Sequence, residues 1–233
     1  EGLQPRSGIV YGEKIPQTLI LMENEKKFEV DLLRGQKTGF YLDQRENRKT
    51  VSSYAKNKEI LNCFCYTGGF SVYALACGAS FVTSIDSSAD AINLAQTNIG
   101  LNDLSLDCTR WITGDVFHEL RRFRDEGRSF DMIIMDPPKF APTTAQVERA
   151  ARGYKDINLL AFKLLRPNGI LATFSCSGGV SAELFQKIVT GAALDAGVNA
   201  QILNTLTQGI DHPIALHFPE SAYLKGLICR KVH

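Results

Sequence analysis

The stretch Ile60–Gly78, ILNCFCYTGGFSVYALACG, decides the fold. It begins as a short apolar strand over Ile60–Cys65 and continues as a helical segment over Phe70–Cys77. Between them, Gly68 and Gly69 let the backbone approach a ligand closely, and the helix that follows offers free N–H groups. The spacing is not G-x-G-x-x-G, so a dinucleotide pyrophosphate site is poorly supported. The turn is either a ligand-binding loop or a tight strand-to-helix connection.

The same alternation continues downstream. We predict strands over Ser80–Ile85, Thr109–Thr113, Phe130–Met135 and Ile170–Phe174, and helices over Ser88–Ile99, Val116–Arg124, Tyr154–Leu165 and Ala182–Ala196. Strands that alternate with helices indicate an α/β fold with a parallel sheet and right-handed crossovers. The last strands, Gln201–Thr207 and Leu224–Arg230, lack a crossover helix between them, so we expect them to be antiparallel to each other.

The segment before Ile60 reads differently. Thr18–Met22 and Phe28–Leu33 flank a polar turn, which predicts a β-hairpin. A polar and aromatic stretch follows over Gly35–Arg48, and a helix is expected over Arg45–Lys56. We therefore divide the chain into a linker with a hairpin, residues 1–35, and a main domain, residues 36–233.

Composition limits the class of protein. The chain has 233 residues, a formal charge of +1, 44% hydrophobic and 22% charged residues, which is ordinary globular composition. No apolar run approaches the roughly 18–20 residues of a membrane span, and no leader peptide is present, so we expect a soluble cytoplasmic protein with no membrane partner. The near-neutral charge means that any nucleic-acid surface must be a local basic patch.

The cysteines do not indicate disulfides or a metal site. They form no C-x-x-C pair, and the four histidines are not clustered with them, so we predict free thiols and no bound metal. The six are Cys63, Cys65, Cys77, Cys108, Cys176 and Cys229.

Ligands of parallel sheets bind at the carboxyl ends of the strands. Asp86 follows the second strand of the alternation and can accept hydrogen bonds from ribose hydroxyls, or else can cap the next helix. Asp115 follows the third strand, with the same two alternatives for an adenine amino group and a helix cap. Because no loop cradles a phosphate, a nucleoside ligand is favoured over a nucleotide.

The last two strand ends carry reactive groups. Asp136-Pro137-Pro138-Lys139-Phe140 follows the buried strand Phe130–Met135, and its prolines fix the position of a carboxylate and a lysine. Cys176 stands between two serines after the fifth strand, where it would face the crevice as a nucleophile. Most cysteines in this environment are buried and inert, so position alone distinguishes Cys176 from the other five.

Together these loops resemble the motifs of class I S-adenosylmethionine-dependent methyltransferases. The resemblance is closer to one branch, the bacterial 23S rRNA cytosine-5 methyltransferases of the ribosomal large subunit methyltransferase I family. The shared motifs are LNCFCYTGGFS (61–71), SIDSS (84–88), GDVF (114–117), DPPKF (136–140) and FSCS (174–177), with the longer VDLLRGQKTGFYLDQRENR (30–48), RGYKDIN (152–158) and DHPIALHFPESAYLKG (211–226).

The resemblance implies a Rossmann-like fold with a mostly parallel seven-stranded sheet, S-adenosylmethionine as cofactor, S-adenosylhomocysteine as product and ribosomal RNA as substrate; it leaves a homodimer open. Family members begin with a PUA RNA-binding domain, which is missing here although its joint (2–12) is present, so we expect that an N-terminal part was removed. Part of Lys37–Arg45 would cover the cofactor. The implied cofactor-binding residues are Asn62, Phe64, Tyr66, Thr67, Gly68, Gly69, Asp86, Ser87, Asp115, Val116, Asp136, Pro137, Gln44 and Arg45.

The implied reaction needs a nucleophile, because carbon 5 of cytosine does not accept a methyl group unaided. Our hypothesis gives that role to Cys176, with Asp136 holding the base and Lys139 either lowering the thiol pKa or orienting the base. Two alternatives stay open: nitrogen methylation of an RNA base, which needs no cysteine, and a non-catalytic RNA-binding protein of the same fold. A set of basic residues near the site, Arg149, Arg152 and Lys155, either contacts phosphate or only solvates a helix.

Overall fold

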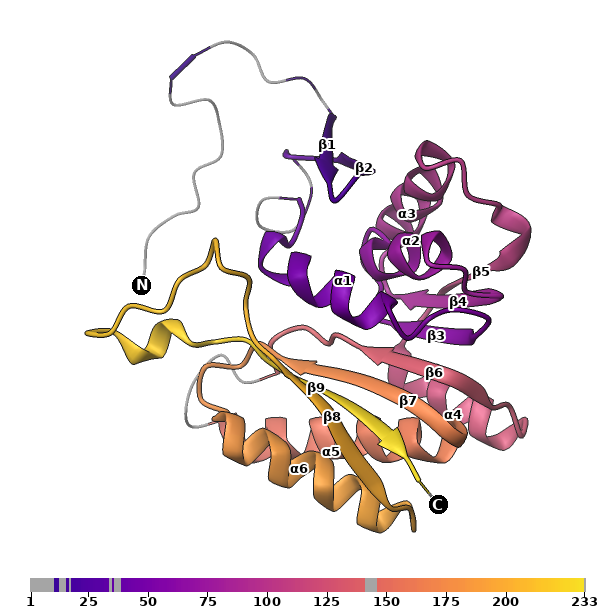
Figure 1. Cartoon of the computed structure of the whole chain (residues 1–233), viewed down its shortest axis with the longest axis vertical. Coiled ribbons are helices and arrows are strands. Elements are labelled where there is room, and N and C mark those ends of the chain that lie inside the picture. Colours follow the sequence, from indigo (N-terminus) through magenta and orange to yellow (C-terminus); the bar gives the residue numbers. More distant parts are fainter. Residues whose placement is uncertain are drawn as a thin grey trace.

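A seven-stranded sheet forms the centre of the computed structural model, which describes residues 11–12, 16, 18–33, 35, 39–140 and 146–232 (Figure 1). Its strands lie in the order β5-β4-β3-β6-β7-β9-β8. Their bounds are β3 Glu59–Cys63, β4 Phe81–Asp86, β5 Thr109–Thr113, β6 Phe130–Met135, β7 Leu165–Ser175, β8 Ala200–Leu206 and β9 Lys225–Lys231.

Strand direction indicates where the sheet would bind a ligand. The strands from β3 to β7 pair in parallel, and β9 pairs antiparallel with both β7 and β8. The chain moves outward from β3 through β4 to β5 and then returns to β6 on the other side of β3. The strand order therefore reverses between β3 and β6, and a ligand crevice is expected at their carboxyl ends.

Helices cover both faces of this sheet. In Figure 1, α1, α2 and α3 lie on one side, and α4, α5 and α6 lie on the other. Their bounds are α1 Arg45–Ser52, α2 Gly69–Ala76, α3 Ala89–Leu101, α4 Val116–Asp125, α5 Val147–Leu164 and α6 Ala182–Asp195. A parallel sheet needs this cover because its strands are apolar on both faces.

Two buried clusters fill the space between helices and sheet. The larger one joins β6 residues such as Ile133 to Phe123 of α4, Tyr154 of α5 and Phe185 of α6. The other packs Phe70 of α2 on the opposite face of the sheet. The FDMIIM strand β6 contributes to both clusters, which explains its continuous apolar sequence.

The hairpin consists of β1 Leu19–Glu23 and β2 Lys26–Val30, paired antiparallel around Asn24 and Glu25, as predicted. Phe28 of β2 packs with Tyr73 of α2 and Ile99 of α3 in a third cluster. The hairpin thus shares a core with two of the helices that cover the seven-stranded sheet. The division of the chain at residue 35 stays a prediction.

Most predicted elements are confirmed within a few residues, and β5 and β6 have the predicted bounds. The helix expected over Arg45–Lys56 ends at Ser52, and α5 begins at Val147 instead of Tyr154. The start of β7 was also wrong: Leu165 already pairs with Phe130, and the ladder resumes at Ile170 after an irregularity. Residues 166–169, which contain a proline and a glycine, resemble a helix stop in sequence but bulge out of a strand here.

Candidate active site

A strained turn follows β3. Phe64, Tyr66 and Gly68 have φ angles of 58°, 47° and 78°, all in the left-handed region that non-glycine residues rarely adopt. A Cβ atom on Gly68 would lie 2.9 Å from the Cβ of Ala95 in α3, so glycine is required there. Such backbone strain persists where the surrounding structure enforces it, and it concentrates at functional sites.

Asp86 holds this turn in place. Its Oδ2 accepts a hydrogen bond from the Tyr66 N–H at 2.8 Å, and its Oδ1 accepts one from the Ser88 N–H at 3.0 Å. The Thr67 carbonyl accepts a hydrogen bond from Asn98 Nδ2 at 2.9 Å. Neighbouring loops therefore determine the shape of the turn through their side chains.

The helix-capping alternative is confirmed for Asp115 but is wrong for Asp86, and neither finding excludes a ligand role. Ser88, rather than Asp86, caps α3 by accepting a hydrogen bond from the Ala91 N–H. Asp115 caps α4 by accepting one from the His118 N–H at 2.8 Å. Asp115 and Ser87 are exposed at this edge, whereas Val116 is buried.

Asn62 lies below the turn and is fully buried. Its Nδ2 donates to Ser71 Oγ at 2.8 Å, and Ser71 Oγ lies 2.8 Å from Ser84 Oγ. Asn62 Oδ1 has no hydrogen-bond partner among the described residues. We call this part of the crevice, at the carboxyl ends of β3, β4 and β5, the glycine half.

The opposite side of the crevice centres on Asp136, directly after β6. Its Oδ1 accepts a hydrogen bond from Gln44 Nε2 at 2.9 Å, across 92 positions of sequence. Burial and the nearby Asp43 carboxylate raise the pKa of Asp136 to about 7, although the Gln44 hydrogen bond lowers it. A carboxyl group with this pKa can either donate or accept a proton near neutral pH.

Residues 39–48, which we call the leader, reach this carboxyl group because several long-range hydrogen bonds hold them in place. Asn47 Nδ2 donates to Gln44 Oε1 at 2.7 Å and to the Thr207 carbonyl at 2.9 Å. The Tyr223 hydroxyl donates to Asp43 Oδ2 at 2.6 Å. Arg45 points to the outer rim, where it forms ion pairs with Glu46 and with Asp211.

Cys176 follows β7 and is half-buried. Its charge acts on the pKa values of residues from four other segments: Tyr41 of the leader, Tyr154 of α5, Tyr223, and Lys225 of β9. We call Cys176, Asp136 and these neighbours the cysteine half of the crevice. Tyr41 lies near both Asp136 and Cys176, and its pKa is raised to about 12, first by burial.

The other buried cysteines are poor nucleophiles. Burial raises the thiol pKa of Cys63 and Cys65, and raises that of Cys229 to about 12. Cys77 and Cys108 are accessible but lie away from the crevice, at the end of α2 and before β5. Cys176 is thus the accessible thiol at the carboxyl edge of the sheet.

Sequence reasoning missed two parts of the site. An aromatic row joins the halves: the ring of Phe140 lies 6.4 Å from that of Phe64 and 4.7 Å from that of Tyr154. Lys225 was also missed, although it lies in a stretch that carries the family resemblance. Their roles depend on pairing between distant segments, so no local pattern marks them.

The leader also contacts the strained turn of the glycine half. Tyr41 contacts the ring of Tyr66 with centroids 5.4 Å apart, and the Tyr66 hydroxyl donates to the Gly39 carbonyl at 3.2 Å. The leader therefore contacts the strained turn, whereas its predicted cover of the cofactor stays a prediction. Residues 36–38 and the joint at 2–10 lie outside the described residues.

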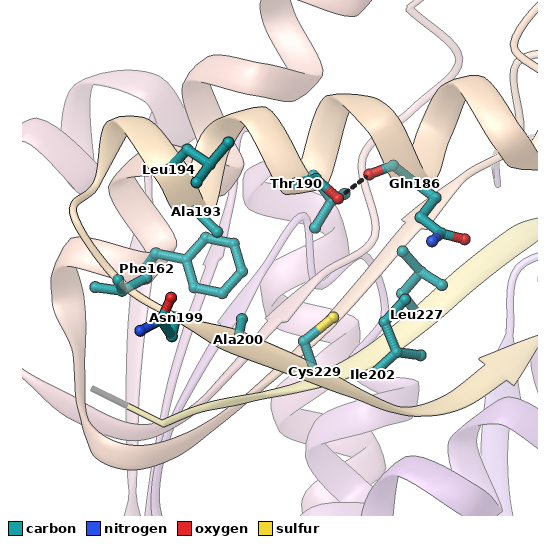
Figure 2. A pocket seen from close by; sticks show the side chains of 12 residues that line it. Phe162, Gln186, Thr190, Ala193, Leu194, Asn199, Ala200, Ile202, Leu227 and Cys229 are labelled. Carbon is teal, nitrogen blue, oxygen red and sulfur yellow. Dashed lines mark hydrogen bonds between the residues drawn. The ribbon is translucent and has the colours of Figure 1, made fainter.

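A separate hollow is shown in Figure 2. It lies between α6 and the strands β8 and β9, with Thr190, Leu194, Ile202 and Cys229 in its lining. It contains none of the predicted site residues. Among the described residues there is no group of three or more metal-ligating side chains, and no helix is both long and apolar enough to cross a membrane.

The chain is similar in sequence to known methyltransferases. The model of the S-adenosylmethionine-dependent methyltransferase family matches residues 5–192. Ribosomal RNA large subunit methyltransferase I of Tolumonas auensis is 57% identical over 233 residues, which are 100% of this chain and 59% of that protein. Its namesake from Aeromonas salmonicida is 53% identical over 230 residues, covering 99% of this chain and 58% of the relative. The chain thus spans less than two thirds of the length of these relatives.

Solved structures agree in fold. A methyltransferase structure from Streptococcus mutans superimposes with a TM-score of 0.85 at 26% identity, over 95% of this chain and 57% of that one. Another methyltransferase, complexed with S-adenosylhomocysteine, gives a TM-score of 0.86 at 26% identity, over 95% and 58%. These findings confirm the predicted fold class and methyl donor. The chain belongs to the family of S-adenosylmethionine-dependent methyltransferases.

Proposed function

We propose that this chain is the catalytic part of an enzyme that methylates carbon 5 of a cytosine in large-subunit ribosomal RNA through a covalent adduct with Cys176. The names of the similar proteins support the ribosomal RNA substrate. The observation that carries the choice of carbon 5 is the position of Cys176, a half-buried thiol at the end of β7 that shares its neighbour Tyr41 with Asp136. A ribosomal substrate implies a cytoplasmic enzyme.

The polar groups of the glycine half suit the binding of the cofactor. The strained turn Tyr66–Gly69 would hold the methionine part, Asp86 and Ser87 would hold the ribose, and Asp115 and Val116 would hold the adenine. Asn62 Oδ1, buried and unpaired among the described residues, leaves an acceptor below the turn. When bound, S-adenosylmethionine supplies an electrophilic methyl group. Phe64, Pro137, Gln44 and Arg45 complete the proposed set, with Arg45 at the outer rim.

The reaction begins at the Cys176 sulfur. The thiolate bonds to carbon 6 of the cytosine, and the electron pair of the 5,6 double bond makes carbon 5 nucleophilic. Carbon 5 bonds to the methyl carbon, and the electron pair of the broken sulfur–methyl bond stays on the departing S-adenosylhomocysteine. A base then removes the carbon 5 proton, which restores the double bond and expels the thiolate.

Asp136 serves the first of these steps. Attack at carbon 6 drives negative charge into the ring, toward the ring nitrogen and the amino group. Because burial keeps a proton on the carboxyl up to about pH 7, Asp136 can donate a hydrogen bond to that nitrogen as charge develops. Gln44 fixes the orientation of the carboxyl through its bond to Oδ1.

Lys139 is exposed at the rim of the crevice, a position suited to orienting an incoming base. The target cytosine has to leave any stacked structure before it reaches the thiol. Arg149 and Arg152 are exposed on α5 near the same rim, whereas Lys155 pairs with Asp195 at 2.7 Å. We therefore assign phosphate contact to the two arginines and not to Lys155.

Nitrogen methylation is the alternative reaction. It would use Asp136 and Lys139 and would leave Cys176 without a chemical role. A non-catalytic RNA-binding protein would bind cofactor but transfer no methyl group. The two alternatives and the proposal differ in which product forms and in whether Cys176 is needed.

The test compares the protein with its Cys176→Ala and Cys77→Ala variants. Each is incubated with labelled S-adenosylmethionine and unmodified ribosomal RNA, and the RNA is digested to nucleosides for mass spectrometry. We expect 5-methylcytidine, a loss of about 10⁴-fold or more in Cys176→Ala, and no change in Cys77→Ala. Methylation at nitrogen, or full activity of Cys176→Ala, would overturn the proposal.

A further inference from the structure

Lys225 is a buried lysine that the reaction above does not use. It is the first residue of β9, opposite Ser175 of β7 in the antiparallel ladder, and its exposed fraction is 8%. Ser175 immediately precedes Cys176, so the pairing of the two strands fixes Lys225 beside the thiol-bearing segment. Lysine is almost never buried to this degree without a partner for its charge.

The hydrogen bonds of Lys225 are all to neutral groups. Its Nζ donates to the Ser177 carbonyl and to the Tyr223 carbonyl, both at 2.8 Å. None of the ion pairs among the described residues includes Lys225. The Lys225 side chain therefore lies beside Ser177, the residue after Cys176, without a carboxylate to balance its charge.

Several titratable groups surround the pair. Tyr41 comes from the leader, Tyr154 from α5 and Tyr223 from the segment before β9. The hydroxyl oxygen of Tyr154 lies 3.0 Å from Ser177 Oγ.

Asp136 and the nearby Asp43, the carboxyl groups next to this cluster, have other partners. Asp43 accepts its hydrogen bond from Tyr223, and Asp136 accepts its own from Gln44. The thiolate of Cys176 is thus the anion best placed to balance Lys225.

Electrostatics agree with this geometry. The pKa of Lys225 is lowered to about 8, first by burial, while the thiolate of Cys176 raises it and the positive charge of Lys139 lowers it by smaller amounts. An amine with a pKa this close to the ~8.5 of a free thiol can take the proton of such a thiol at little cost.

We propose that Lys225 takes the proton of the Cys176 thiol and holds the resulting thiolate as an ammonium–thiolate pair. The S–H bond breaks, its electron pair stays on Sγ, and the proton bonds to the neutral amine Nζ. This inference rests on the proposed role of Cys176 as nucleophile. It transfers to Lys225 the thiol-activating role that the sequence suggested for Lys139.

The test measures thiol reactivity and needs no RNA. Iodoacetamide alkylation of the folded protein is followed against pH, and peptide mass spectrometry reads Cys176 and Cys77 separately in the same digest. Cys77 is exposed and is the internal reference. We expect the alkylation midpoint of Cys176 in the unmodified protein to lie below the ~8.5 of a free thiol.

Variants then separate charge from structure. Lys225→Met should raise the midpoint by about one pH unit or more, which means roughly tenfold slower alkylation at pH 7. Lys225→Arg, which keeps the cation, should restore most of the lowered midpoint, and Lys139→Met should change it little. Cys63 and Cys65 should stay protected in every variant, because their exposure would indicate unfolding.

Two outcomes would overturn the inference. One is a Cys176 midpoint at or above ~8.5 in the unmodified protein, which decides the matter even if Lys225→Met does not fold. The other is an unchanged midpoint in folded Lys225→Met. A lowered midpoint without methyl transfer to carbon 5 would instead contradict the proposed function and leave the pair intact.

Discussion

The two halves of the crevice are built from contacts of very different range. In the glycine half, Asp86 binds the turn at Tyr66 across 20 positions of sequence, and Asn98 binds Thr67 across 31. In the cysteine half, Gln44 reaches Asp136 across 92 positions, and Tyr223 reaches Asp43 across 180. The proposed site of the methyl donor is thus built by local motifs, whereas the proposed chemistry depends on the complete fold.

This difference decides how much the sequence predicts. The glycine turn, the strand ends at Asp86 and Asp115, and the bounds of β5 and β6 follow from local patterns of apolar residues and turn residues. Lys225 does not, because it stands 225 − 176 = 49 positions after Cys176 and joins it only through the pairing of β9 with β7. Even the start of β7 was misjudged, because Pro167 and Gly169 look like a helix stop until pairing with β6 is known.

The largest expected effect comes from the buried ion pair that joins α1 to the hairpin. Arg48 forms two hydrogen bonds to Glu23, at 2.8 and 2.7 Å, and both side chains are almost completely buried. Arg48→Met leaves the buried Glu23 carboxylate without a cation and with only the hydrogen bond from the Tyr73 hydroxyl, so we expect the free energy of unfolding to fall by about 3 to 5 kcal/mol in urea titrations. Lys187→Ala, which removes an exposed pair with Glu183, is the control and should cost less than about 0.5 kcal/mol.

We expect the charged form of Asp136, a residue that the proposed chemistry uses, to lower the stability of the folded protein. An unfolded aspartate loses its proton near pH ~3.9, whereas the folded protein keeps it to about pH 7. The folded state therefore binds more protons between these values, and stability falls as pH rises through that window.

Asp136→Asn removes this penalty. Above pH 7 the variant should be more stable than the unmodified protein by about 2 to 4 kcal/mol, with the difference vanishing near pH 4, while methyl transfer drops about 10²-fold. Asp125→Asn, at an exposed carboxylate ending α4, should change neither quantity. A stability difference independent of pH would contradict the raised pKa.

Gly68 tests the glycine half in the same way. Gly68→Ala places a Cβ atom 2.9 Å from that of Ala95 at a φ of +78°, so we expect a loss of about 1 to 3 kcal/mol and weaker binding of S-adenosylmethionine by calorimetry. Gly100→Ala in α3 meets open space and should stabilise the protein by up to about 1 kcal/mol. Equal effects of the two substitutions would show that the turn is not strained.

The smallest effect concerns RNA at the rim. Arg149→Ala and Arg152→Ala should each reduce the salt dependence of RNA binding, lowering the slope of log K against log salt by about 0.7 to 0.9. Lys155→Ala should not, because Lys155 already pairs with Asp195. Filter binding at several salt concentrations measures the slopes. If all three variants have the slope of the unmodified protein, α5 is not part of the RNA-binding surface.

The most direct test of the central claim traps the covalent step. Ribosomal RNA containing 5-fluorocytidine is incubated with S-adenosylmethionine and one of three proteins: the unmodified protein, Cys176→Ala or Cys77→Ala. Each mixture is then run on a denaturing gel. Fluorine at carbon 5 blocks the final proton removal, so the account predicts a protein–RNA adduct that survives in Cys77→Ala and disappears in Cys176→Ala. An adduct that persists without Cys176, or methylation of ordinary RNA with no adduct at all, would contradict it.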